Sequence, residues 1–232
     1  MTAKIFEERL KQYSGDFHPV VPYKRGDVFL LLDFTESNRE LTGEILKDTN
    51  RFTRYINSKL AVSGAKYGIG GYNEHRTIYS RSHVFDGAEP RRLHLGIDIW
   101  GRPYTKIMAP FDGIVHSFAF NNAFGDYGAT IILTHNLDGM TFHTLYGHLS
   151  LNSLKNLNEG QHIRKGDVFT EFGIPFENGQ WPPHLHFQLI LDMQGLKGDY
   201  PGVCQYSEGD QYLNNCPDPD LILGMMHLAA ES

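Results

Sequence analysis

Six short runs of β-branched and aromatic residues follow one another through the second half of the chain, and turn residues separate them. Runs of this kind, bounded by Gly, Pro, Asn and Asp, are typical of strands joined by tight turns. The pattern predicts a mainly β fold with α additions, built on an antiparallel β-sheet or sandwich. The predicted strands cover residues 106–108, 113–119, 129–135, 141–148, 167–172 and 184–191.

The first 75 residues have a mixed pattern. Apolar residues recur at helical spacing around Phe6, and again between Phe52 and Leu60, where Asp48 provides a start signal and Gly64 a stop. We therefore expect an N-terminal mixed α/β extension over residues 1–75 and a second domain over residues 76–232. Further predicted elements are a strand at 28–34, close backbone approach at the glycine cluster 68–71, a short helix at 150–157 and an apolar helix at 220–230.

The charge balance excludes one class of partner. The chain has 21 Lys and Arg against 27 Asp and Glu, a formal net charge of −6, and no basic block. Nucleic-acid binding needs a basic surface, so it is not expected. The longest apolar run, 28–32, is too short to span a membrane.

The compartment is less constrained by the sequence. Glu7, Glu8 and Arg9 interrupt the position where a secretory signal would have its apolar core, which slightly favours a cytoplasmic location. A periplasmic or extracellular location stays open if the chain is a processed form. The two cysteines, Cys204 and Cys216, could form one disulfide, but we expect them to stay reduced if the protein is cytosolic.

Eight of the twelve histidines lie between His94 and His186, and three local patterns stand out among them. The patterns are His94-Leu-Gly-Ile-Asp98, Tyr146-Gly-His148 and His184-Leu-His186. Gly96 disfavours a helix in the first pattern. In a strand, side chains two residues apart share a face, so His184 and His186 are expected to point the same way.

These residue types suit a catalytic zinc site, which uses three protein ligands and leaves one position open. Each pattern also has a structural interpretation: a hydrogen-bonded turn for the first, a capped strand end for His148, and packed imidazoles for the third. Together, in one β-rich segment, they favour a metal site. The residues alone do not decide whether His184 or His186 is the ligand.

Taken together, the three patterns resemble the signature motifs of the lysostaphin-type zinc metallopeptidases, a bacterial family of cell-wall endopeptidases. The connecting segments 108–118, 126–135 and 157–173 are also similar to the core strands and turns of that family. The resemblance covers about residues 91–190, which would be the catalytic core of the second domain, followed by a C-terminal loop and helix.

The resemblance implies a zinc-dependent endopeptidase that cleaves peptide bonds in peptidoglycan-type or other short peptides. It makes His94, Asp98 and His186 the ligands of one Zn²⁺ per chain. It makes His148 and His184 the catalytic histidines, which would orient or deprotonate the attacking water and stabilise the oxyanion.

Three further side chains are candidates for substrate binding. Trp181 lies in a loop that departs from the family pattern, and it is either a substrate platform or a loop anchor. Tyr146 either donates a hydrogen bond near the site or packs its ring. Arg92, which precedes the first motif, either meets a substrate carboxylate or is a solvated surface residue.

Several other interpretations of the sequence stay open. Segments 197–203 and 215–220 resemble a divergent branch in which the peptidase module lies beside aminotransferase-like modules. The polar cluster 72–75 could lie over the zinc, as N-terminal residues do in latent relatives. A catalytically silent zinc-binding module that binds a peptide or partner is an alternative, and a non-haem iron enzyme is a less favoured one. The scissile bond, the role of residues 1–75 and the oligomeric state are not determined.

Overall fold

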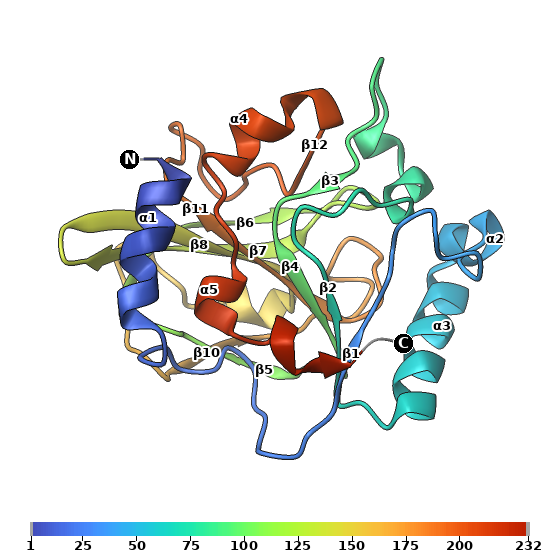
Figure 1. Cartoon of the computed structure of the whole chain (residues 1–232), viewed down its shortest axis with the longest axis horizontal. Coiled ribbons are helices and arrows are strands. Elements are labelled where there is room, and N and C mark those ends of the chain that lie inside the picture. Colours follow the sequence, from blue (N-terminus) through green and yellow to red (C-terminus); the bar gives the residue numbers. More distant parts are fainter. Residues whose placement is uncertain (1, 231–232) are drawn as a thin grey trace.

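The computed structural model describes residues 2–230, and a nine-stranded sheet lies at the centre of this part of the chain (Figure 1). The strand order is β13-β1-β2-β4-β11-β8-β7-β6-β9. The strands are β1 (Phe29–Leu31), β2 (Tyr67–Gly70), β4 (Ile97–Trp100), β6 (Gly113–Asn121), β7 (Gly128–Leu137), β8 (Met140–Leu149), β9 (His162–Ile163), β11 (His184–Ile190) and β13 (Ala229–Ala230). Two small two-stranded sheets pair β10 (Val168–Glu171) with β5 (Lys106–Met108), and β12 (Val203–Cys204) with β3 (Leu93–His94).

The predicted fold class, mainly β with a few helices and mostly antiparallel, is confirmed. Each of the six predicted strands is present, with bounds that differ by at most two residues. One edge of the large sheet is different, because β1 pairs in parallel with both β2 and β13. Parallel neighbours need a crossover connection, and α2 (Gly43–Lys47) and α3 (Thr49–Ser63) provide it between β1 and β2.

Helix α3 begins and ends where the sequence predicts. The Asp48 side chain accepts hydrogen bonds from the backbone N–H groups of Asn50 and Arg51 at its start. Gly64 ends it in the left-handed conformation, with φ of 67°. Its apolar face, which includes the fully buried Phe52, packs beside the sheet.

Two predicted helices are shorter than expected. The apolar helix predicted at 220–230 is wrong beyond its first turn: α5 covers only Asp220–Leu223, because Gly224 ends it with φ of 54°. The chain then makes a 3₁₀ turn at 226–228 and adds β13 to the sheet edge. The predicted helix at 150–157 is a 3₁₀ turn at 151–154. A further short α-helix is α4 (Gly209–Leu213), and other 3₁₀ turns lie at 11–13, 78–81, 83–85 and 206–208.

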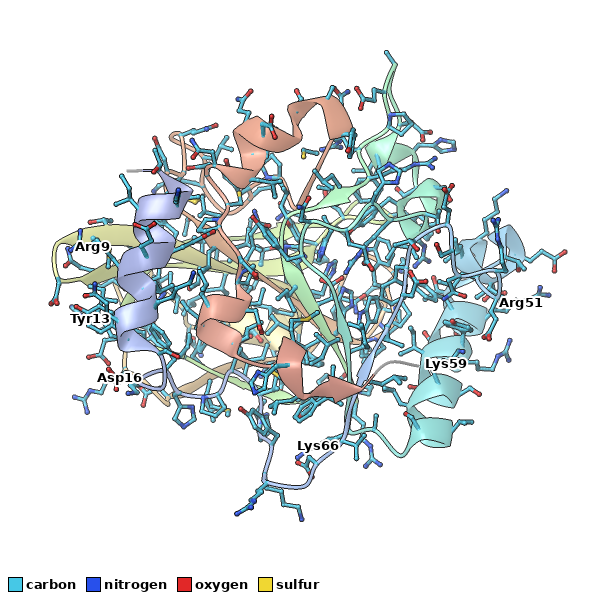
Figure 2. The ribbon with its side chains drawn as sticks, in the orientation of Figure 1. Arg9, Tyr13, Asp16, Arg51, Lys59 and Lys66 are labelled. Atoms are coloured by element: carbon cyan, nitrogen blue, oxygen red, sulfur yellow. The ribbon has the colours of Figure 1, made fainter. Side chains whose placement is uncertain are left out.

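Residues of the N-terminal third pack on both sides of the sheet (Figure 1). On α1 (Ala3–Leu10), Arg9 donates to the backbone carbonyl of Asp138, and the hydroxyl of Tyr13 just beyond donates to the Asp138 carboxylate. Figure 2 shows Arg9 and Tyr13 beside the β7–β8 hairpin, with Arg51 and Lys59 at the opposite end of the molecule. Strands β1 and β2 belong to the central sheet. The division into residues 1–75 and 76–232 stays a prediction.

Two findings bear on the expected environment of the chain. Among residues 2–230, no helix combines the length and apolar character that crossing a bilayer requires. Cys204 and Cys216 are both free and buried.

Candidate metal centre

A row of four residues crosses the middle of the sheet. Gly70 on β2 pairs with Asp98 on β4, Asp98 pairs with His186 on β11, and His186 pairs with Gly147 on β8. Directly paired residues on neighbouring strands have Cβ atoms about 4.5–5.5 Å apart. The register of the sheet therefore brings Asp98 and His186 together. His94 joins them from β3, four residues before Asp98.

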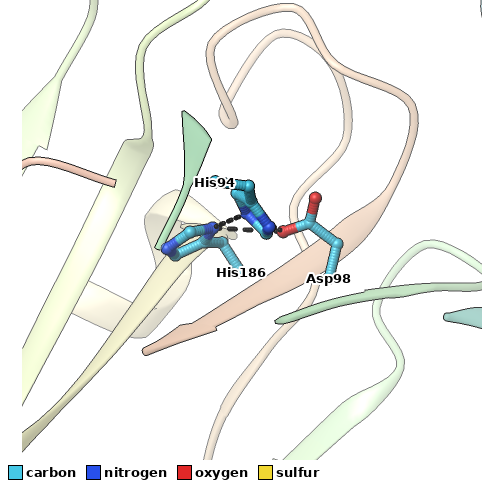
Figure 3. Close-up of side chains that lie close together, drawn as sticks. All are labelled: His94, Asp98 and His186. Carbon is cyan, nitrogen blue, oxygen red and sulfur yellow. Dashed lines mark hydrogen bonds and ion pairs between the residues drawn. The ribbon is translucent and has the colours of Figure 1, made fainter. Parts of the chain in front are cut away.

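The three side chains meet through one atom each (Figure 3). His94 Nε2 lies 3.0 Å from His186 Nδ1, and Asp98 Oδ1 lies 3.1 Å from His186 Nδ1 and 3.4 Å from His94 Nε2. Zinc ligands at about 2.0–2.1 Å in tetrahedral geometry are separated by about 3.3–3.4 Å. The triangle of ligand atoms thus fits a small divalent ion after shifts of a few tenths of an ångström.

The outer hydrogen bonds of the two imidazoles leave lone pairs facing inward. His94 Nδ1 lies 2.9 Å from the Gly71 carbonyl, which can only accept, so Nδ1 carries the proton. His186 Nε2 lies 2.8 Å from Gln188 Oε1, and the amide of Gln188 is oriented by its donation to the Pro201 carbonyl. Two nitrogen lone pairs and a carboxylate oxygen therefore converge, and a cation between them removes their mutual repulsion.

The charges of these groups suit metal binding. Burial lowers the pKa of His94 to about 3, and the nearby Arg76 adds to this effect, so the imidazole is neutral. Burial alone would disfavour a charged Asp98, but the positive charge of the buried Arg76 guanidinium beside it holds the pKa of its carboxyl well below the usual value. Neutral imidazoles and an ionised carboxylate are the forms that bind a metal.

Glycines make room around the ligands. A Cβ on Gly96 would lie 2.6 Å from the His186 ring, and a Cβ on Gly147 would lie 2.5 Å from the Tyr127 ring. Neither contact is possible for a larger residue without movement of the aromatic ring. The glycine inside the His94 to Asp98 motif is therefore needed for the position of the third ligand.

His184 lies on β11, two residues before His186. Its ring stacks on Trp100, with centroids 3.8 Å apart, and its Nδ1 is 2.8 Å from the carbonyl of Pro182. Burial lowers the pKa of His184 to about 4. The imidazole is therefore neutral, with its proton on Nδ1 and a lone pair on Nε2.

His148, at the end of β8, is arranged in the same way. Its Nδ1 lies 2.8 Å from the carbonyl of Asn178, its ring centroid lies 4.1 Å from that of His184, and burial holds its pKa well below the usual value. Its backbone is in the left-handed region, with φ of 62°. Such a conformation is costly for a residue other than glycine and is often found at functional sites.

A cleft with a volume of about 170 Å³ opens beside these residues. Asp98, His148, His184 and His186 line it, and residues 78–91 contribute much of its wall. The other lining side chains include the aromatic Tyr79, Phe85, Tyr127, Trp181 and Tyr200, together with the charged Arg91, Asp126 and Asp199. The cleft thus combines two neutral imidazoles with apolar surface and charges of both signs.

The candidate substrate residues lie in different surroundings. Trp181 lines the cleft, although it is only 3% exposed. Tyr146 is fully buried in the core, where its ring packs against Phe187, and it does not line the cleft. Arg92 does not line the cleft either, whereas Arg91 does. Substrate binding by Trp181, Tyr146 and Arg92 stays a prediction.

Sequence reasoning missed the groups that hold the ligands from outside. These are the carbonyl of Gly71, the guanidinium of Arg76 and the amide of Gln188. The glycine cluster 68–71 and the polar cluster 72–75 next to Arg76 were the available signals, and a position of the polar cluster over the zinc stays a prediction. Its backbone bonds to that of His94, and the Tyr72 hydroxyl donates to the carbonyl of Cys216.

Comparison with known proteins identifies relatives of the segment that carries these motifs. Residues 92–197 match the family described as Peptidase family M23. The chain is 31% identical over 102 residues to a Haemophilus influenzae protein described as an uncharacterized metalloprotease, over 44% of this chain and 19% of that protein. The chain thus spans about a fifth of the length of the curated relative it matches.

Solved structures give partial overlays. A zinc-containing peptidase from Vibrio cholerae is 24% identical, with 42% of this chain and 27% of that chain covered and a TM-score of 0.34. The catalytic domain of the antimicrobial peptidase lysostaphin from Staphylococcus simulans is 19% identical, with 69% and 96% covered and a TM-score of 0.41. These matches give no support to a branch found beside aminotransferase-like modules, so that expectation stays a prediction.

Proposed function

We propose that this chain, a homologue of Peptidase family M23 over residues 92–197, is a zinc-dependent peptidase that cleaves bonds inside short peptides. The observation that carries the proposal is the convergence of His94 Nε2, His186 Nδ1 and Asp98 Oδ1 beside a cleft lined by two further neutral imidazoles. When bound, zinc supplies Lewis acidity, which polarises a peptide carbonyl and acidifies a water molecule.

His148 and His184 have the proton-transfer role in this proposal. Their Nδ1 protons are held by backbone carbonyls, so their Nε2 lone pairs can accept a proton from the attacking water. A protonated imidazole in this position then stabilises the developing oxyanion and returns the proton to the leaving amine. Their low pKa values favour the neutral starting form at neutral pH.

Peptidoglycan-type peptides are the substrate class that we propose for the cleft. Its aromatic side chains, among them Trp181 and Tyr79, would pack against the substrate, and Arg91 with Asp126 would meet the charged groups of a short peptide. The family resemblance supports this class. The small volume of the cleft favours recognition of a few residues rather than of a long folded segment.

One experiment tests the proposal against both alternatives. The full chain, purified without chelator, should contain about one zinc per chain by elemental analysis, and it should release peptides from purified cell-wall sacculi, identified by mass spectrometry. Zinc without hydrolysis of sacculi or of a short-peptide library would indicate a silent binding module. Bound iron in place of zinc would contradict the proposal.

A further inference from the structure

The two carboxylate oxygens of Asp98 have different partners. Oδ1 faces the lone pairs of His94 and His186, while Oδ2 accepts a hydrogen bond from Arg76 Nη1 at 2.5 Å. An arginine bound to one oxygen of a carboxylate leaves the other oxygen for a metal. Asp98 can therefore offer a single oxygen, in a fixed direction, to an ion held between the two imidazoles.

The guanidinium of Arg76 is held on every side. It is fully buried, with Nε 2.6 Å from Glu74 Oε2 and Nη2 3.2 Å from the carbonyl of Gly71. Nη1 also approaches the hydroxyl of Tyr79, and the charged group lies 5.2 Å from the centre of the Phe34 ring. With each nitrogen bonded, the planar group cannot turn away from Asp98.

The sheet register makes this contact possible. Gly70, the residue paired with Asp98, has no side chain, and a Cβ at this position would lie 2.5 Å from Arg76 Nη2. Arg76 therefore reaches Asp98 across the glycine. The same short segment carries the Gly71 carbonyl that holds the proton of His94.

We infer that Arg76, held in place by Glu74, is a positioning residue that keeps Asp98 a one-oxygen ligand and so sets the affinity and coordination of the metal centre. With Gly71, it makes the segment 70–76 part of the site, although this segment precedes the residues that match the peptidase family. The inference rests on the proposed zinc site. It assigns a role to Gly71 and Glu74, which belong to the N-terminal region 1–75 whose function the sequence left open.

The charges around Asp98 explain why arginine is suited to this position. Asp98 is buried and Glu74 is partly shielded from solvent, and Arg76 lies between them. Loss of Arg76 would leave two carboxylates without a shared cation, and Oδ2 of Asp98 would be free to bind the metal as well. A lysine has a single ammonium group, which cannot reproduce the planar fork that contacts both carboxylates.

Zinc affinity of the full chain, measured by competition with a chromophoric chelator, tests the inference. Arg76→Met and Arg76→Lys should each weaken zinc binding by about 10–100-fold, the usual effect of losing a partner of a metal ligand. Substitution by Co²⁺ should give a weaker d–d absorption band in Arg76→Met than in the wild type, because a second bound oxygen raises the coordination number.

Arg81→Met is the matched control. Arg81 is also buried, but its guanidinium packs against the Trp181 ring at 4.5 Å and donates to the Thr49 hydroxyl. Its loss should lower the thermal midpoint of the apoprotein without changing zinc affinity. If Arg76→Met does not fold, Arg76→Lys decides the question. Wild-type zinc affinity and Co²⁺ spectrum in the folded Arg76 variant would overturn the inference, whereas a wild-type chain that binds no zinc would overturn the proposed function itself.

Discussion

His94 and His186 face each other through unprotonated nitrogens only 3.0 Å apart. Each imidazole donates its one N–H to an outer acceptor: His94 to the carbonyl of Gly71, and His186 to the amide oxygen of Gln188. Two lone pairs at this distance repel each other unless a cation lies between them. The pair is therefore a place where a bound cation would stabilise the local structure.

Removal of one ligand should abolish metal retention. In Asp98→Asn and in His94→Ala the zinc content should fall from about one per chain to below about a tenth, because two remaining ligands hold the ion weakly. Elemental analysis after gel filtration measures this. The exposed His162 provides the control, since His162→Ala should keep the wild-type content. Full zinc retention in either ligand variant would contradict the ligand assignment.

Replacement of His148 should separate catalysis from metal binding. Asn is the substitution of choice, because it tolerates the left-handed backbone that His148 adopts better than other non-glycine residues do. In His148→Asn, kcat should fall by about 10²–10⁴-fold, since the proton acceptor is lost, while one zinc per chain remains. Hydrolysis assays with parallel metal analysis test both parts. Wild-type kcat in the folded, zinc-loaded variant would remove His148 from the mechanism.

Stability should depend on pH through His135, which is remote from the metal ligands in sequence. It is buried between the carbonyl of Asp112 and the hydroxyl of Thr144, and burial lowers its pKa to about 4. The pKa of His135 in the folded chain is lower than its pKa of about 6.5 in the unfolded chain. At pH values between these two pKa values, the unfolded chain therefore binds more protons than the folded chain does. Its contribution to stability is complete above about pH 6.5 and is lost as the pH falls toward 4.

The corresponding measurement is urea unfolding of the chelated protein at two pH values. Between about pH 7 and pH 5, the contribution of His135 to the free energy of unfolding should fall by about 2 kcal/mol. In His135→Gln this part of the pH dependence should be absent. An unchanged slope in His135→Gln would show that other buried histidines account for the acid sensitivity.

Gly96→Ala should damage the site through packing alone. The added methyl group would lie 2.6 Å from the His186 ring and 2.8 Å from the carbonyl of Phe187. Overpacking of this kind costs about 1–3 kcal/mol of folding stability, and it should also displace His186 and weaken zinc binding. Gly43→Ala is the control, because the added Cβ meets nothing within 4 Å. Wild-type zinc affinity in Gly96→Ala would show that the ring has room to move.

Local patterns in the sequence determined the six core strands, the bounds of α3 and the histidines and carboxylate from which the ligands are proposed, while the family resemblance favoured His186 over His184. Strand periodicity, turn residues and helix caps act over a few positions, so they can be recognised without the fold. The same reasoning overextended the predicted C-terminal helix, because it followed the apolar residues past Gly224, where the helix ends.

Only the tertiary structure decided what surrounds the ligands. The pairing of Gly70 with Asp98 joins residues far apart in the sequence, and it alone brings Arg76 to the outer oxygen of Asp98. The parallel pairing of β1 and the burial of Tyr146 likewise depend on which strands become neighbours. Sheet register is set by the summed packing of whole strands, so it cannot be predicted from a local sequence motif. The sequence therefore determined which residues could bind a metal, and the fold decided which residues orient them.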